Sequence, residues 1–143
     1  MKRVLMRRFL LLFALILTGC TGASAPKITA QQVFDRLQRS GLATNARTVP
    51  SPVADSSFAP CADRLGFDIP GTGFLGIINI CPKSTADTIM ARPTATTDTR
   101  PMPINIEAYR YRSNGGTVIV AIERTCPQDT AARIGREVQI IPE

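Results

Sequence analysis

The sequence predicts an α+β fold in which helices pack on a small antiparallel sheet made of two hairpins. Two turn signals, Pro70-Gly71-Thr72 and Asn114-Gly115, each lie between segments that have the apolar character of paired strands. Each of these two hairpins is followed by a Cys-Pro pair and a helical segment. With one more helix in front, the predicted order is α-ββα-ββα. We also expect a last strand over Glu137 to Ile141.

The first helix is predicted by signals at both of its ends. Thr29-Ala30-Gln31-Gln32 matches the capping-box pattern, so the helix is expected to start at Ala30. Gly41-Leu42 is typical of a left-handed cap in which the leucine folds back on the helix. The helix is therefore expected to end near Ser40.

The hairpin around Pro70-Gly71-Thr72 predicts a disulfide. A three-residue loop at these positions sets a register in which Phe67 lies opposite Leu75, and Leu65 lies opposite Ile77. Extending this register outward places Cys61 opposite Cys81, at a separation that a disulfide can bridge. The strand over Phe74 to Ile80 is apolar on both faces, which favours a central position in the sheet.

The hairpin around Asn114-Gly115 joins Asn105 to Ser113 with Gly116 to Arg124. A two-residue turn there predicts two cross-strand pairs, Tyr109 with Val120 and Tyr111 with Val118. We expect the tyrosines to face the core because they share a face with these valines and with Ile122. Arg110 and Arg112 are expected to point the other way.

The two Cys-Pro segments, Cys81 to Ile89 and Cys126 to Ile134, share the pattern C-P-x-[SD]-T-A-x-x-I. This match fits either an internal duplication or the chemistry of helix starts alone, because proline is common in a first helical turn. The order of elements is similar in outline to the small modules of secreted inhibitors of the β-lactamase-inhibitor type. That resemblance rests on topology, and no binding residue is carried over from it.

The N-terminus has the pattern of an export signal. Four basic residues precede an apolar stretch of 11 residues, Phe9 to Gly19, which is too short to cross a bilayer as a helix. Leu17-Thr18-Gly19-Cys20 resembles the lipobox of bacterial lipoprotein precursors. The resemblance implies removal of residues 1–19 and a diacylglyceryl group on Cys20, with residues 20–27 as a tether and 28–143 as one domain. Thr21 is not the aspartate associated with inner-membrane retention, so the resemblance implies sorting to an outer membrane where one exists.

Composition excludes several functional classes. The chain has no histidine, which removes Ser-His-Asp and Cys-His catalysis and mixed Cys/His zinc sites. Four of its 17 basic residues lie in the first 19, so the rest carries 13 basic and 11 acidic residues, a net charge of +2. No basic cluster with interleaved aromatic residues is left there, so we do not expect nucleic acid as a partner. Two stretches rich in proline, serine and threonine, Ala43 to Pro60 and Arg92 to Pro103, are expected to be long loops.

Apart from Cys20, three cysteines remain, so at least one thiol is free or paired with another chain. We expect this to be Cys126, buried at a junction between a strand and a helix. A redox role is the alternative, because Cys81 and Cys126 both precede helix starts, where a thiol pKa is lowered. Cys81-Pro82-Lys83-Ser84 also resembles the C-x-x-S pattern of thioredoxin-like proteins, although a domain that begins with a helix lacks their early βαβ unit.

No other group of residues predicts a reaction. Four aspartates are scattered without the spacing of a metal loop, namely Asp63, Asp68, Asp87 and Asp98. Gly71-Thr72-Gly73 lacks the helix and lysine of a phosphate-binding loop. We therefore expect no catalytic residue, metal or cofactor. Two functional classes stay open, a lipid-anchored envelope protein that binds another protein or a wall component, and a thiol-dependent redox protein.

Overall fold

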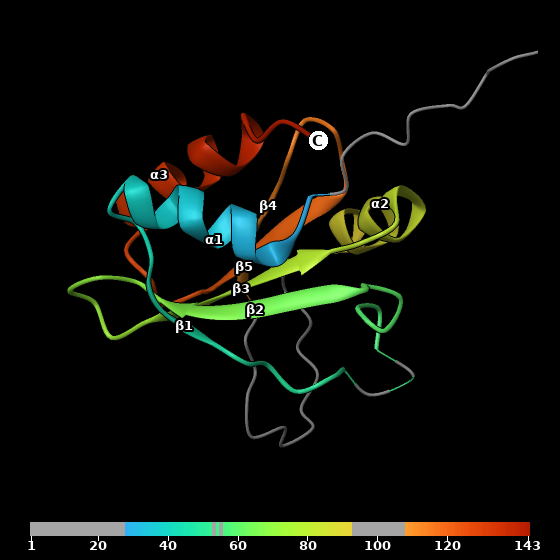
Figure 1. Ribbon diagram of the computed structural model, residues 1–143, viewed down its shortest axis with the longest axis horizontal. Coiled ribbons are helices and arrows are strands. Elements are labelled where there is room, and N and C mark those ends of the chain that lie inside the picture. The colour runs from blue at the N-terminus through green and yellow to red at the C-terminus, as the bar shows by residue number, and fades with distance from the viewer. Residues whose placement is uncertain (1–27, 53, 55, 93–107) are drawn as a thin grey trace, which may run out of the picture.

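The computed structural model describes residues 28–52, 54, 56–92 and 108–143, which form an antiparallel sheet and three helices (Figure 1). The five strands have the order β1-β2-β3-β5-β4. This arrangement confirms the predicted α+β class. In chain order the elements are α1 (Ala30–Arg39), β1 (Thr44–Arg47), β2 (Asp63–Asp68), β3 (Leu75–Ile80), α2 (Lys83–Ala91), β4 (Ala108–Arg112), β5 (Val118–Glu123) and α3 (Gln128–Gln139).

The sheet separates two cores of unequal size. Helices α1 and α3 lie side by side on one face and cover the large core, which includes Phe67, Ile78 and Val120 (Figure 1). Helix α2 covers a smaller cluster on the opposite face, where Ile89 packs against Ile119. The alternation of strands accounts for this division, because residues next to each other in a strand point to opposite faces.

Both ends of α1 are as the sequence predicts. Thr29 and Gln32 form the capping box, and Gly41 has a positive φ of 68°. The backbone N–H of Leu42 donates to the carbonyl of Leu37 at 2.8 Å, and that of Gly41 donates to the carbonyl of Gln38 at 2.9 Å. This pair of bonds is the Schellman motif, which satisfies the last carbonyls of the helix.

Strand β1 lies inside the stretch Ala43 to Pro60 that was expected to be a loop, so that prediction is wrong over its first residues. The strand is short and lies at the edge of the sheet, with a register shift between Thr44 and Arg47. Asn45 has a φ of 51°, and its side chain donates to Asp68 on β2. Side-chain hydrogen bonds to Asp68, which is distant in the sequence, help to hold this strand. The residues of β1 themselves therefore show little of the pattern that predicts a strand.

The β2–β3 hairpin has a different register from the predicted one. Its loop has four residues, since the N–H of Ile69 donates to the carbonyl of Phe74 at 2.9 Å. Phe67 therefore lies opposite Gly76 and not Leu75, and Leu65 lies opposite Ile78 and not Ile77. The ring of Phe67 fills the space where Gly76 lacks a Cβ. A shift of one residue reverses a strand's faces, so Leu75 and Ile77 point away from Phe67.

The β4–β5 hairpin is shifted by two residues, which leaves its faces as predicted. Tyr109 pairs with Ile122 and Tyr111 with Val120, so the two predicted valine pairs are wrong. Both tyrosines nevertheless pack on the large core. The connection is longer than two residues because the carboxylate of Glu143 accepts hydrogen bonds from Ser113 and from the N–H groups of Thr117 and Val118.

The segment Glu137 to Ile141 is not a strand, which corrects that prediction. Helix α3 continues to Gln139 because its buried positions keep the helical spacing, ending with Ile134, Gly135 and Val138. Gly135 allows the ring of Tyr111 to lie against the helix, where a Cβ would collide with it.

The two Cys-Pro segments start their helices in the same way but end on opposite faces of the sheet. Pro82 and Pro127 are the N-caps, so each lies just before the first helical turn in which the sequence placed it. The carbonyl of each proline accepts a hydrogen bond at 3.0 Å. Cys81 follows β3 directly, whereas a turn separates β5 from Cys126. If the two segments were repeats related by a two-fold axis, the axis would exchange the antiparallel strands β3 and β5. Both helices would then lie on the same face of the sheet. The two segments thus share the way their helices start and are not related by such an axis.

We predict that Glu143→Gln lowers the free energy of unfolding at pH 7 by about 1 kcal/mol, because a charged acceptor of several hydrogen bonds becomes neutral. Burial raises the pKa of Glu143, but its bonds from Ser113, Thr117 and Val118 outweigh this and lower the pKa below the usual 4.5. The contribution is therefore complete above pH 4.5 and is lost as the pH falls through the lower pKa of the folded state.

Urea unfolding at several pH values tests this prediction. Glu137→Gln is the matched control, because it removes the same charge from a partly exposed ion pair with Arg36 whose atoms are 3.6 Å apart. A difference between Glu143→Gln and the parent chain that is the same at pH 7 and well below pH 4.5 would contradict the assignment.

Candidate functional site

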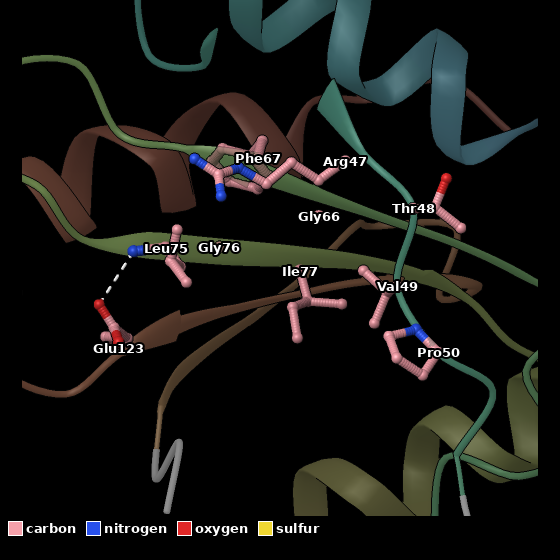
Figure 2. Close-up of a pocket in the computed structure, with 10 residues that line it drawn as sticks. All are labelled: Arg47, Thr48, Val49, Pro50, Gly66, Phe67, Leu75, Gly76, Ile77 and Glu123. Carbon is pink, nitrogen blue, oxygen red and sulfur yellow. Dashed lines mark hydrogen bonds between the residues drawn. The ribbon is translucent and has the colours of Figure 1, made fainter. Parts of the chain in front are cut away.

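A groove lies on the face of the sheet that α2 covers in part. Helix α2 packs over the end of this face near Cys81, through Ala86 and Ile89. The other end of the face carries Leu75 and Ile77, which the hairpin register turns away from the large core. The space there has a volume of about 220 Å³ and an apolar lining (Figure 2).

The segment that follows β1 forms one wall of this groove. Figure 2 shows Val49 and Pro50 running beside β2 and β3, with Ile77 on the floor. Gly66 on β2 allows the close approach, since a Cβ there would lie 3.0 Å from the Val49 side chain. The groove therefore depends on a glycine in the strand below it.

Arg64 fixes the wall to the sheet. Its Nη1 donates to the carbonyl of Pro50 at 2.8 Å, and its Nε donates to Oδ1 of Asn79 at 2.8 Å. Asn79 is 1% exposed, so this bond satisfies a polar side chain that the central strand buries. Burial lowers the pKa of Arg64, which is still a cation at neutral pH.

Charged groups lie at the rim of the groove. Arg47 forms an ion pair with Asp68 at 2.7 Å, and hydrogen bonds from Arg47 and Asn45 lower the pKa of Asp68. Glu123 accepts a hydrogen bond from the N–H of Leu75 at 2.9 Å. An apolar floor with charges at the rim can hold an apolar group.

Cys61 and Cys81 form the predicted disulfide, with a Cα–Cα distance of 4.1 Å. The geometry that brings the two cysteines together differs from the predicted one, because in the observed register Cys61 and Cys81 are not opposite each other. The chain has a turn before β2, where the N–H of Cys61 donates to the carbonyl of Phe58 at 3.0 Å. This turn brings Cys61 to the face where Cys81 lies, and both pack against Ile89.

Cys126 is the unpaired cysteine of the described residues, and it is buried in the large core as expected. Burial and then the charge of Glu123 raise the pKa of this thiol. The expectation that a helix start lowers its pKa is therefore wrong. Cys126 is thus a buried, protonated thiol and not the low-pKa thiolate of a reactive cysteine.

Three of the four scattered aspartates, Asp63, Asp68 and Asp87, have structural partners. Asp63 accepts a hydrogen bond from the N–H of Ala30 at the start of α1, and Asp87 pairs with Arg112 at 2.6 Å. No group of three potential metal ligands occurs within the part of the chain that the structure describes. Several predictions lie outside the described residues: the signal over 1–19, the lipidation of Cys20, the tether over 20–27, and the loop Arg92 to Pro103 beyond its first residue, with Asp98.

Comparison with known proteins gives no relative. No protein-family model, curated protein or solved structure matches this chain. Within the described ranges, none of the helices has the length and apolar character to span a bilayer.

Sequence reasoning missed the residues that form the groove. Val49 and Pro50 lie in the stretch interpreted as a loop, and Ile77 was placed on the wrong face. One signal was present in the sequence. Asn79 interrupts the apolar strand Phe74 to Ile80, and a polar side chain in a central strand needs a partner such as Arg64.

We predict that Cys126 does not react with a thiol reagent in the native protein and reacts in denaturant, because its thiol is buried and neutral.

Non-reducing peptide mapping should link Cys61 to Cys81. The bond closes a loop of about 20 residues, so Cys61→Ala/Cys81→Ala is expected to lower the free energy of unfolding by roughly 3 kcal/mol. Cys126→Ser is the control for the thiol count, and a peptide that links Cys126 to Cys61 or Cys81 would overturn the prediction.

Proposed function

We propose that this chain is a lipid-anchored protein of the cell envelope without catalytic activity, which binds an apolar segment of another envelope protein or of a wall component. The binding role rests on one observation, the apolar groove between the Val49-Pro50 wall and the floor formed by β2 and β3. The groove is open at the surface and is held by Arg64, so its shape does not depend on a ligand.

The anchor rests on the resemblance of Leu17-Thr18-Gly19-Cys20 to a lipobox. The disulfide between Cys61 and Cys81 supports the same location, because disulfides persist outside the cytoplasm. A diacylglyceryl group has two chains, which is enough for stable membrane attachment without a helix that crosses the bilayer.

We predict that Cys20→Ala blocks processing, because the lipoprotein signal peptidase requires a lipidated cysteine. The parent protein should partition into the detergent phase, and its intact mass should show a diacylglyceryl group at residue 20 with residues 1–19 removed. The variant should lose the mature form that partitions into detergent. Cys126→Ser provides a matched cysteine change that should leave processing intact. A mature Cys20→Ala protein in the detergent phase would refute the anchor.

We predict that a photo-crosslinking residue at Leu75 links to a discrete partner in the intact envelope, because Leu75 lies at the open groove and is 37% exposed. The same residue at Ile140, which is 60% exposed and lies at the end of α3, is the matched control. Val49→Glu puts a charge into the apolar wall and should reduce crosslinking at Leu75 by at least about tenfold. Equal crosslinking at both sites, or no effect of Val49→Glu, would contradict the groove as the binding site.

A further inference from the structure

The chain enters the domain on the side of the sheet that lies away from the groove. Ile28 precedes Thr29, the N-cap of α1, and α1 lies with α3 on the face opposite α2 (Figure 1). Seven residues lie between Cys20 and Ile28, and a fully extended chain from one to the other spans at most about 28 Å. Given the proposed lipid anchor, on which this inference rests, the layer of α1 and α3 is the part of the domain tied closest to the membrane.

Two hollows mark the surface of this layer. The first has a volume of about 320 Å³, with Arg36 and Arg39 of α1 along it. Ile28, Ile141 and Pro142 give the same hollow an apolar portion. The second lies past the end of α1 and is polar, with lining residues that include Ser40, Arg133 and Arg136. Four arginines from two helices thus gather around two neighbouring hollows, an arrangement we call the arginine face.

The charges of the arginine face are only partly neutralised. Two acids lie among the four arginines: Glu137, which pairs with Arg36 at 3.6 Å, and Glu143, which lines the first hollow. Among the described residues, no ion pair to an acid joins Arg39, Arg133 or Arg136, and these three residues are exposed. The same two helices also carry Asp35, which accepts a hydrogen bond from Gln31, and Asp129 in the first turn of α3, but neither aspartate lines a hollow. Four arginines and two glutamates thus leave an excess of two positive charges around the two hollows.

We propose that the arginine face binds the headgroups of anionic phospholipids in the membrane that holds Cys20. Arginine binds phosphate oxygens through two parallel N–H groups, and the apolar portion of the first hollow fits the glycerol and upper acyl carbons of the lipid. Each arginine at an anionic surface strengthens binding roughly fivefold. The domain would then lie with α1 and α3 against the bilayer and with the groove directed away from it, toward a partner.

Binding to vesicles tests this proposal without a lipid anchor. The processed chain, residues 20–143 with Cys20→Ser, contains every contact described above and carries no lipid. We expect it to sediment with vesicles that contain phosphatidylglycerol and not with vesicles of phosphatidylcholine alone, and we expect added salt to release it. Arg39→Gln/Arg136→Gln should weaken this binding about 25-fold. Neither residue has an ion pair in the described part of the chain, so the fold should be retained.

The matched control is Lys83→Gln/Arg92→Gln, which removes two charges from the exposed ends of α2 on the other face. It should leave vesicle binding unchanged. Equal weakening by both pairs would mean attraction by net charge alone, and this result or a lack of binding to phosphatidylglycerol vesicles would overturn the proposal. The mass of the mature N-terminus tests the anchor separately, so a chain that binds vesicles through these arginines but carries no lipid would refute the anchor and leave the arginine face intact.

Discussion

The disulfide at the end of β3 organises the face of the sheet that has few other means of support. This face has a small core, in which Cys61 and Cys81 pack with Ala86, Ile89 and Ile119. So few side chains bury little apolar surface, and a covalent link that restricts the unfolded chain compensates for this. The link also fixes the stretch before β2, from which the groove wall comes. Arg64 completes the attachment, because it holds the backbone of Pro50 against the central strand.

The opposite face needs no such link because its packing is extensive and close. Two aromatic rings lie against glycines there, Phe67 on Gly76 and Tyr111 on Gly135. Each pair brings backbone and ring together at a distance that a Cβ would prevent, within the sheet for Phe67 and between sheet and helix α3 for Tyr111. The large core can thus hold the sheet rigid, while the other face keeps part of its surface open for the groove. The difference between the two faces follows from the alternation of the strands.

Signals within a few residues predicted the three helices and the two hairpins correctly, whereas pairing between distant residues was predicted poorly. The capping box at Thr29 and the glycine cap at Gly41 depend only on neighbours, and both are present. The two hairpin registers depend on loop length, which Glu143 sets in one case from far along the chain. Strand β1 and the groove wall depend on side chains of β2, so their own sequence carries little information. The disulfide was found through a wrong register, because a turn near Phe58 restored the proximity of the two cysteines.

The same geometry explains why one of two similar cysteines is paired and the other is free. Cys81 continues β3, where its N–H donates to the carbonyl of Thr117 just before β5, and its side chain follows the strand alternation to the α2 face. After β5 the residues Arg124 and Thr125 form a turn, and Cys126 reaches the large core on the other face. The sheet therefore lies between the thiol of Cys126 and the disulfide. Thiol–disulfide exchange requires direct attack of a thiolate on a sulfur, so exchange between these cysteines needs the sheet to open. The fold thereby keeps Cys126 apart from the disulfide and preserves the pairing that supports the groove.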